Sequence, residues 1–208
     1  MTNSQTTTTI LIRHAESSPS RHLPESDWPL SSLGHRQAKA LADELADANI
    51  SKVVSSPYLR AIDTVRPVAE RIDCPIDVCT ELQERRLCEG VRDDWYDLIK
   101  QAWSDFAFAL PNCESGFDCQ RRVQVCLRDL VERYAGKTIA VCSHGNAIGL
   151  FLNSIEPGFG FANWKNMKNP DVFWIDWLKG RPEWLVNISN GAAEQTHAPD
   201  TLSRAGNA

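Results

Sequence analysis

The chain lacks any apolar stretch close to the ~20 residues that a helix needs to cross a bilayer. It also lacks an excess of positive charge, because 22 lysines and arginines stand against 27 aspartates and glutamates, which gives a net charge of -5. Such a chain has no general attraction for nucleic acid or for an anionic membrane. Residues 1–7 are polar and have neither the basic region nor the apolar core of a signal peptide. We therefore expect a cytoplasmic protein that binds neither nucleic acid nor membrane and attracts anionic substrates only through a local basic pocket.

Cysteine is present, but its pattern favours neither a disulfide framework nor a zinc site. The seven cysteines are an odd number at irregular spacing, and no Cys-x-x-Cys occurs. Reduced thiols are the simplest interpretation. Cys142 lies in an apolar run, so we expect a small core residue there and not a nucleophile.

The hydrophobic pattern predicts strands that alternate with helices in a single core of moderate size. Apolar and β-branched runs predict strands at 10–12, 52–55, 76–79, 138–143, 172–177 and 184–188, the last two joined as a hairpin across 179–182. Helical spacing predicts helices at about 30–48, 57–72, 94–110, 117–134 and 147–155. This alternation is typical of an α/β protein, a three-layer α/β/α sandwich with a mostly parallel central sheet. We expect one domain over residues 1–190 and a disordered polar tail over 191–208.

Basic side chains follow the ends of several predicted strands. Arg13 and His14 follow the first strand, Arg60 lies in the loop-to-helix turn after the second, and His144 ends the strand at 138–143. Ligands of open α/β sheets bind beyond the carboxyl ends of the strands, so these residues can meet in one crevice. Arginine forks match phosphate oxygens, and a neutral histidine can attack phosphorus to form a phosphohistidine. The chemistry predicts phosphoryl transfer, with a nearby carboxylic acid to protonate the leaving oxygen and no metal or other cofactor, because the arginines supply the positive charge.

The same residues carry a resemblance to a known family. The segment Arg13-His14-Ala15-Glu16 resembles the Arg-His-Gly/Ala-Glu signature of the histidine phosphatase superfamily, the phosphoglycerate-mutase-like proteins. Further segments follow in the order found in that family, and jointly they are far more specific than the tetrapeptide. They are the helix start at 30–38, the Ser-Ser-Pro segment at 55–64 with Asp63 in place of Gln, Leu-x-Glu at 82–84, the Glu-Ser loop and helix at 114–122, and Ser143-His144-Gly145.

The resemblance implies a role for each matching residue. His14 would be the phosphorylated nucleophile, and the phosphoryl group would be bound by Arg13, Arg60 and His144. Glu84 would protonate the leaving group and then activate water. Glu81 is the rival for this acid role, but the family spacing favours Glu84.

Family members are phosphatases or mutases, and the resemblance favours a phosphatase that acts on a small phosphorylated metabolite. Mutases carry an Asn where this chain has Ser20, an Arg-His-Tyr-Gly segment where it has residues 85–88, and a basic insert where residues 89–110 hold only Arg92 and Lys100 as cations. A cofactor-dependent phosphoglycerate mutase is the second hypothesis, and a non-catalytic phospho-ligand binding module is the third.

Several points stay open in the sequence. Segments 17–27 and 89–110 are expected to form the pocket walls that select the substrate. Trp95 and Trp103 could line a lid, although packing is the expected role. Arg85 and Arg86 could contact substrate or solvent. The oligomeric state is undecided, with a homodimer among the options.

Overall fold

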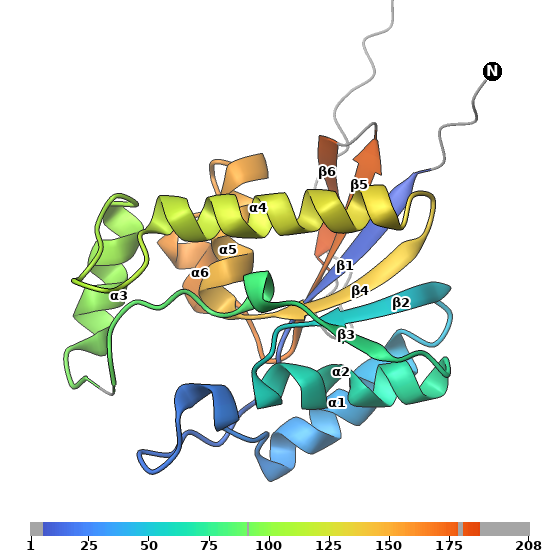
Figure 1. Ribbon diagram of the computed structural model, residues 1–208, viewed down its shortest axis with the longest axis horizontal. Helices are drawn as coiled ribbons and strands as arrows, with labels where there is room; N and C mark the ends of the chain where they lie inside the picture. Colours follow the sequence, from blue (N-terminus) through green and yellow to red (C-terminus); the bar gives the residue numbers. More distant parts are fainter. Residues whose placement is uncertain (1–5, 91, 179–180, 188–208) are drawn as a thin grey trace, which may run out of the picture.

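A six-stranded sheet forms the middle layer of the protein, and helices cover both of its faces (Figure 1). The computed structural model describes residues 6–90, 92–178 and 181–187. The strands follow the order β3-β2-β4-β1-β5-β6 across the sheet. Their bounds are β1 Thr7–Arg13, β2 Ile50–Ser55, β3 Ile76–Val78, β4 Thr138–Ser143, β5 Asp171–Leu178 and β6 Arg181–Asn187.

Helices connect most of the strands. The α-helices are α1 Ser32–Glu44, α2 Leu59–Arg71, α3 Trp95–Ser104, α4 Gly116–Arg133, α5 Gly145–Ile155 and α6 Phe161–Asn166. Two 3-10 turns, η1 Glu25–Asp27 and η2 Thr80–Leu82, lie in the loops that follow β1 and β3. In Figure 1, α1 and α2 lie on one side of the sheet and α4 and α5 on the other. The predicted three-layer α/β sandwich is confirmed.

The strand pairings place the ends of the two central strands together. β1 pairs with β4 in parallel, and the register ends with Arg13 opposite Ser143. β2 pairs in parallel with both β4 and β3, whereas β5 runs antiparallel to β1 and to β6. The predicted mostly parallel sheet with a terminal hairpin is therefore present. The residues that follow β1 and β4 are His14 and His144, so the sheet itself brings the two histidines together.

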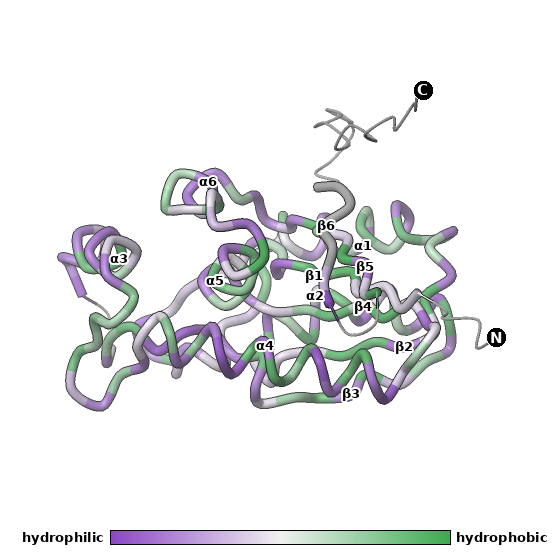
Figure 2. Tube along the Cα trace, turned by 90° about the horizontal axis from the view of Figure 1, so that it is seen from above, coloured by the Kyte–Doolittle hydropathy of each residue, from purple (hydrophilic) through white to green (hydrophobic). Residues whose placement is uncertain are grey.

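Alternate residues of the central strands face the two helical layers. Ile10 and Ile12 of β1 pack with residues of α1 and α2, whereas Leu11 packs with residues of α4 and α5. Apolar side chains on both faces explain why the central strands appear as unbroken hydrophobic runs. Figure 2 shows the contrasting pattern of α4, where hydrophilic and hydrophobic residues alternate along a helix with one exposed face.

The structure corrects three expectations about the elements. The helix expected over 94–110 ends at Ser104, because the Asp105 carboxylate accepts a hydrogen bond from the Ala107 N–H and favours a turn. Pro182 lies inside β6, not in the turn before it, since an edge strand tolerates proline. The six-residue helix α6 is absent from the sequence prediction, because one and a half turns are too short for a periodic signal.

The expected polar tail at 191–208 lies outside the described residues, as does Ile188 of the expected last strand. Within the part of the chain that the structure describes, no helix combines the length and the apolar character that spanning a membrane would require.

Candidate active site

The two histidines lie side by side at the carboxyl ends of β1 and β4. Their ring centroids are 5.2 Å apart at an interplanar angle of 62°. The His14 N–H donates to the Ser143 carbonyl at 3.1 Å, which continues the strand pairing as far as the histidine. His14 is 8% exposed and His144 is fully buried. The hydrogen-bonded backbone of the sheet thus sets the positions of both rings.

The hydrogen bonds of His14 define which ring nitrogen is free. Nδ1 lies 2.7 Å from the Ala15 carbonyl oxygen, and a carbonyl can only accept, so Nδ1 carries the proton. Nε2 therefore presents a lone pair, to which Arg60 Nε donates at 3.1 Å. Burial, and then the charges of Arg60 and Arg13, lower the pKa of His14 from 6.5 to about 3. The imidazole is consequently neutral at neutral pH, as a nucleophile must be.

Arg60, in the first turn of α2, is held by Glu25 of the η1 segment. Its Nη1 donates to the Glu25 carbonyl at 2.7 Å, and its Nη2 donates to Glu25 Oε1 at 2.7 Å. The guanidinium also lies against Tyr58 and Trp28, 4.8 and 5.6 Å from the ring centroids. Every nitrogen of this buried guanidinium therefore has a protein partner in the structure.

Arg13 is anchored by the loop that precedes β5. Its Nη1 donates to the Met167 carbonyl at 2.7 Å, and Asp171 lies opposite it in the β1–β5 register. Burial lowers the pKa of Arg13, although the charges of Glu84 and Asp171 oppose this shift. Asn169 of the same loop donates to the His14 carbonyl at 2.7 Å. The loop before β5 thus holds both residues of the Arg-His pair.

The start of α5 brings together nitrogens without partners. His144 Nε2 lies 2.7 Å from Ser56 Oγ, whereas His144 Nδ1, Arg13 Nε and Trp164 Nε1 have no hydrogen-bond partner among the described residues. A Cβ on Gly145 would lie 3.2 Å from Trp164 Nε1 and 3.3 Å from Arg13 Nε, so glycine allows this close approach. Buried nitrogens beside a helix N-terminus form an environment suited to an anion. Burial and the charge of Arg60 lower the pKa of His144, so its ring is neutral as well.

Glu84 reaches the same helix start. Its Oε1 accepts hydrogen bonds from the N–H groups of Arg85 and Ala147 at 2.8 and 3.0 Å, and its Oε2 accepts from the Asn146 N–H at 3.1 Å. Although part of its surface is accessible, removal from water raises the pKa of Glu84 above its usual 4.5, and these hydrogen bonds only partly oppose the shift. The carboxyl group is therefore placed at the N-terminus of α5, which follows His144, with an increased affinity for a proton.

Glu81, the rival for the acid role, has an exposed side chain and does not share these contacts. Its carbonyl oxygen accepts a hydrogen bond from Arg122 at 2.6 Å, and the Gln83 carbonyl accepts from the same Nη1 at 3.1 Å. Arg122 also binds both carboxylate oxygens of Glu114, at 2.8 and 2.6 Å. The Glu-Ser loop and helix thus anchor the backbone that leads to Glu84.

Arg85 contacts neither solvent nor an open pocket, which corrects both roles considered for it. It is 3% exposed and donates to the carbonyls of Glu114, Phe108 and Ala102 at 3.1, 2.9 and 3.4 Å. It therefore joins the loop that carries Glu84 to the segments around α3. Arg86 is exposed.

Aromatic residues of α3 and α6 pack beside the N-terminus of α5. The ring of Trp164 lies 6.0 Å from that of Trp103 and 6.1 Å from that of Trp95, which is 42% exposed. Trp103 is buried and donates to Asn146 Oδ1 at 3.0 Å. Trp103 is thus a packed residue, as expected, and Trp95 presents an exposed ring on the same cluster.

The sequence interpretation missed several residues of this site. They are Glu25, Ser56, Asn146, Trp164, the loop residues 167–170 and Asp171 at the start of β5. Ser56 and Asn146 had a weak signal, since Ser56 lies inside a segment that resembles a family motif and Asn146 directly follows one. Glu25 lies in the segment 17–27 that was expected to form a pocket wall, but its own contact was not predicted. The loop before β5 had no signal, because its contacts join positions far apart in the chain. Within residues 6–90, 92–178 and 181–187, no group of three or more His, Cys, Asp or Glu side chains is placed to hold a metal ion.

Comparison with known proteins extends these observations to nearly the whole chain. The sequence profile of the histidine phosphatase superfamily (branch 1) matches residues 9–188. Two bacterial proteins, each named probable phosphoglycerate mutase GpmB, are similar in sequence. The one from Proteus mirabilis is 25% identical over 206 residues, with 91% of this chain and 94% of that protein covered. The one from Enterobacter sp. (strain 638) is 27% identical over 215 residues, with 93% and 98% covered.

Solved structures named as phosphatases share the fold. A mutant phosphoserine phosphatase from Entamoeba histolytica in complex with phosphoserine superimposes with a TM-score of 0.74 at 21% identity, over 87% of this chain and 96% of that chain. A mycobacterial glucosyl-3-phosphoglycerate phosphatase with inorganic phosphate superimposes with a TM-score of 0.70 at 25% identity, over 91% and 99%.

Proposed function

Because the chain belongs to the histidine phosphatase superfamily, we propose that it is a phosphatase that hydrolyses a small phosphomonoester through a phosphohistidine at His14. The observation that carries this proposal is the state of His14. Its Nδ1 proton is bound by a carbonyl, its pKa is lowered to about 3, and its Nε2 lone pair faces a buried arginine. A neutral, oriented imidazole among cations is what an attack on a phosphoryl dianion requires.

In the first step, Nε2 attacks phosphorus and the bond from phosphorus to the leaving oxygen breaks. Arg60 Nε lies on the lone pair of Nε2, and both of its terminal nitrogens bind Glu25. Arg60 must therefore exchange these partners for phosphoryl oxygens when the substrate enters. Arg13 Nε, which has no partner among the described residues, adds a second guanidinium donor without such an exchange.

His144 supplies a neutral donor to the same group. Ser56 Oγ accepts a hydrogen bond from the Tyr58 N–H at 3.3 Å, and its own proton can be donated to His144 Nε2. In that arrangement the imidazole proton resides on Nδ1, the nitrogen without a partner. His144 Nδ1–H would then bind a phosphoryl oxygen.

Glu84 is the proposed acid and base. Its raised pKa favours the protonated form that donates to the leaving oxygen. The resulting carboxylate, stabilised by the N–H groups of Arg85, Asn146 and Ala147, then accepts a proton from the water that attacks the phosphohistidine. One carboxyl group thus serves both half-reactions.

Two of the cations around α3 already have protein partners, which favours a phosphatase over a mutase. A mutase must hold the carboxylate of a sugar acid while the phosphoryl group moves. Here Arg85 is committed to three carbonyl oxygens, and Arg92 binds both carboxylate oxygens of Asp94 at 2.7 Å each. The exposed ring of Trp95 beside Trp164 favours a leaving group with an apolar or ring-shaped face instead.

A phosphoglycerate mutase is the second candidate, because the two sequence relatives carry that name. The decisive experiment measures phosphate release from a panel of sugar, amino-acid and aryl phosphates, beside an assay for 3-phosphoglycerate isomerisation. Release without isomerisation supports the phosphatase, and isomerisation supports the mutase. Failure to turn over any substrate would favour a phospho-ligand binding module.

Two further measurements sharpen the proposal. When turnover of a phosphomonoester that carries a labelled phosphoryl group is stopped rapidly without acid, one labelled phosphoryl group should be found on His14. EDTA should leave the rate unchanged, since Arg13 and Arg60 supply the positive charge near the reacting phosphorus. Strong inhibition by EDTA would contradict this mechanism.

A further inference from the structure

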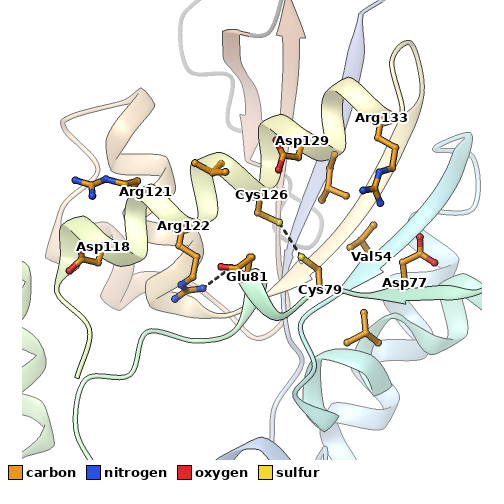
Figure 3. Close-up of a pocket in the computed structure, with 13 residues that line it drawn as sticks. Val54, Asp77, Cys79, Glu81, Asp118, Arg121, Arg122, Cys126, Asp129 and Arg133 are labelled. Atoms are coloured by element: carbon orange, nitrogen blue, oxygen red, sulfur yellow. Dashed lines mark hydrogen bonds between the residues drawn. The ribbon is translucent and has the colours of Figure 1, made fainter. Parts of the chain in front are cut away.

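A groove separate from the candidate active site lies between α4 and the segment formed by β3 and η2 (Figure 3). Its volume is about 460 Å³. Apolar residues such as Val54 and Leu130 line it together with charged residues such as Arg122 and Asp129. None of the proposed catalytic or phosphoryl-binding residues lines this groove.

Two cysteines from different elements meet in this groove. Cys79 Sγ lies 3.3 Å from Cys126 Sγ, and Figure 3 shows the two side chains pointing toward each other. Cys79 follows β3 at the start of η2 and is partly exposed, whereas Cys126 lies on α4 and is buried. Formation of a disulfide requires the sulfur atoms to approach to about 2.05 Å, so a closure of little more than 1 Å would join them.

We propose that Cys79 and Cys126 are a redox-sensitive pair that forms a reversible disulfide and locks η2 onto α4. The groove gives a small oxidant access to Cys79, and Cys126 is already within contact distance as the resolving thiol. Cys74, which is also partly exposed, donates instead to the Pro75 carbonyl. The pair is therefore defined by geometry and not by exposure alone.

The surroundings make the two thiols unequal. The hydrogen bond from Cys126 and the backbone N–H groups of Glu81 and Leu82 lower the pKa of Cys79, although burial opposes the shift. Contact with Cys79, together with burial, raises the pKa of Cys126. Cys79 is thus the thiolate that reacts first, because the thiolate is the nucleophilic form.

With hydrogen peroxide as the oxidant, the atoms balance in two steps. The Cys79 thiolate attacks one peroxide oxygen, the O–O bond breaks, and Cys79 sulfenic acid and hydroxide form. Cys126 sulfur then attacks Cys79 sulfur, the S–O bond breaks, and the hydroxyl group leaves as water with the Cys126 proton. Overall, two thiols and one peroxide yield one disulfide and two waters. A dithiol reductant reverses the reaction by thiol–disulfide exchange.

The cross-link would join α4 to the segment that leads to Glu84, the proposed acid. Cys79 precedes Glu84 by five residues, and Arg122 of α4 already binds the carbonyls of Glu81 and Gln83 between them. A disulfide would add a covalent bond between the same two elements. It would also restrict the unfolded chain, since 46 residues separate the two cysteines (126 − 79 − 1 = 46).

The test is mass spectrometry of the whole protein after titration with hydrogen peroxide, followed by trypsin digestion under non-reducing conditions. We expect a loss of 2 Da and a linked pair of peptides, residues 72–85 joined to residues 123–128. The linked pair should disappear in Cys79→Ser and in Cys126→Ala, and it should persist in the matched control Cys74→Ser. A melting experiment should show that oxidation raises Tm by about 5 °C or more in the wild-type protein and in Cys74→Ser, and that dithiothreitol reverses the rise.

Other outcomes would overturn the proposal. They are disulfides that join other cysteines, separate sulfinic acids on Cys79 and Cys126, or thiols that survive peroxide at levels that oxidise Cys74. If Cys126→Ala fails to fold, the Cys79→Ser variant and the peptide map of the wild-type protein still show whether Cys79 and Cys126 form the disulfide. None of these measurements requires turnover, so their failure is distinguishable from failure of the proposed function.

Discussion

The carboxyl ends of the central strands β1 and β4 and the segment around η1 (Glu25–Asp27) are held in different ways. At the strand ends, His14 and Arg13 are tied to main-chain carbonyls of Ala15 and Met167, and the β1–β4 register places His14 next to His144. The covering segment around η1 is tied to the site by Glu25, whose side chain is 49% exposed in its pair with Arg60. The groups proposed to react thus sit on the hydrogen-bonded sheet, whereas the contact that the proposed mechanism breaks joins buried Arg60 to the half-exposed carboxylate of Glu25.

This difference suggests a division of labour between the two regions. Backbone hydrogen bonds in a sheet keep a nucleophile oriented at little entropic cost during the reaction. The carboxylate of Glu25 is half exposed to water, which weakens its attraction for Arg60, so incoming phosphate can compete for the arginine.

The largest effect is expected from the scaffold. Substitution His14→Ala should lower phosphate release by at least about 10³-fold, because it removes the imidazole on which the proposed phosphohistidine forms. Circular dichroism should show an unchanged fold. The control His35→Ala changes an exposed histidine and should retain full activity. Full activity in His14→Ala would disprove the nucleophile assignment.

Glu84→Gln should separate substrates by leaving group. We expect losses of about 10²–10³-fold with alkyl phosphates, whose leaving oxygen needs a proton, and a much smaller loss with p-nitrophenyl phosphate. Glu81 is exposed and was the alternative for the acid role, so it provides the matched control: Glu81→Gln should change the rate with either substrate only slightly. An equal loss on both substrates would argue against an acid role for Glu84.

Burial of His14 in its neutral form should make the fold sensitive to acid. Its pKa is about 3 in the folded protein against 6.5 as the ordinary value, so between these values the unfolded chain binds a proton that the folded chain does not. The free energy of unfolding should therefore fall as the pH drops below about 6.5, by about 2 kcal/mol from this group between pH 7 and pH 5. Urea titrations at the two pH values should show a smaller difference for His14→Asn than for wild type. If the free energy of unfolding changes equally between the two pH values in wild type and in His14→Asn, His14 does not contribute to the acid sensitivity.

The smallest effect is expected from the covering segment. Glu25→Gln removes the carboxylate that competes for Arg60, so KM for the substrate and the inhibition constant of inorganic phosphate should both fall, by about 3- to 10-fold, with little change in kcat. Asp27→Asn removes a charge from the same turn without touching Arg60 and should leave both constants nearly unchanged. Weaker phosphate inhibition in Glu25→Gln would show that Glu25 assists binding.

Much of this architecture could be predicted from local patterns. The strand at 138–143 matches the structure, and the apolar stripe of α4 is buried as its spacing predicts. The resemblance singled out Arg13, His14, Arg60, Glu84 and His144, and the structure places all five near the carboxyl ends of the central strands. These features share a cause, since each depends on residues close together in the chain or on a motif that is itself a short segment.

Features that depend on long-range contacts could not be predicted. The burial of Arg85 on three carbonyls and the contact of Glu25 with Arg60 each join segments far apart in sequence.

The sequence by itself determined the layered fold and the residue types available for phosphoryl chemistry, because hydrophobic periodicity and short motifs act locally. Only the tertiary structure decided which nitrogen of His14 is free, which glutamate reaches α5, and which two of seven cysteines meet. Those outcomes depend on how loops pack across the sheet, where a shift of 1–2 Å makes or breaks a hydrogen bond.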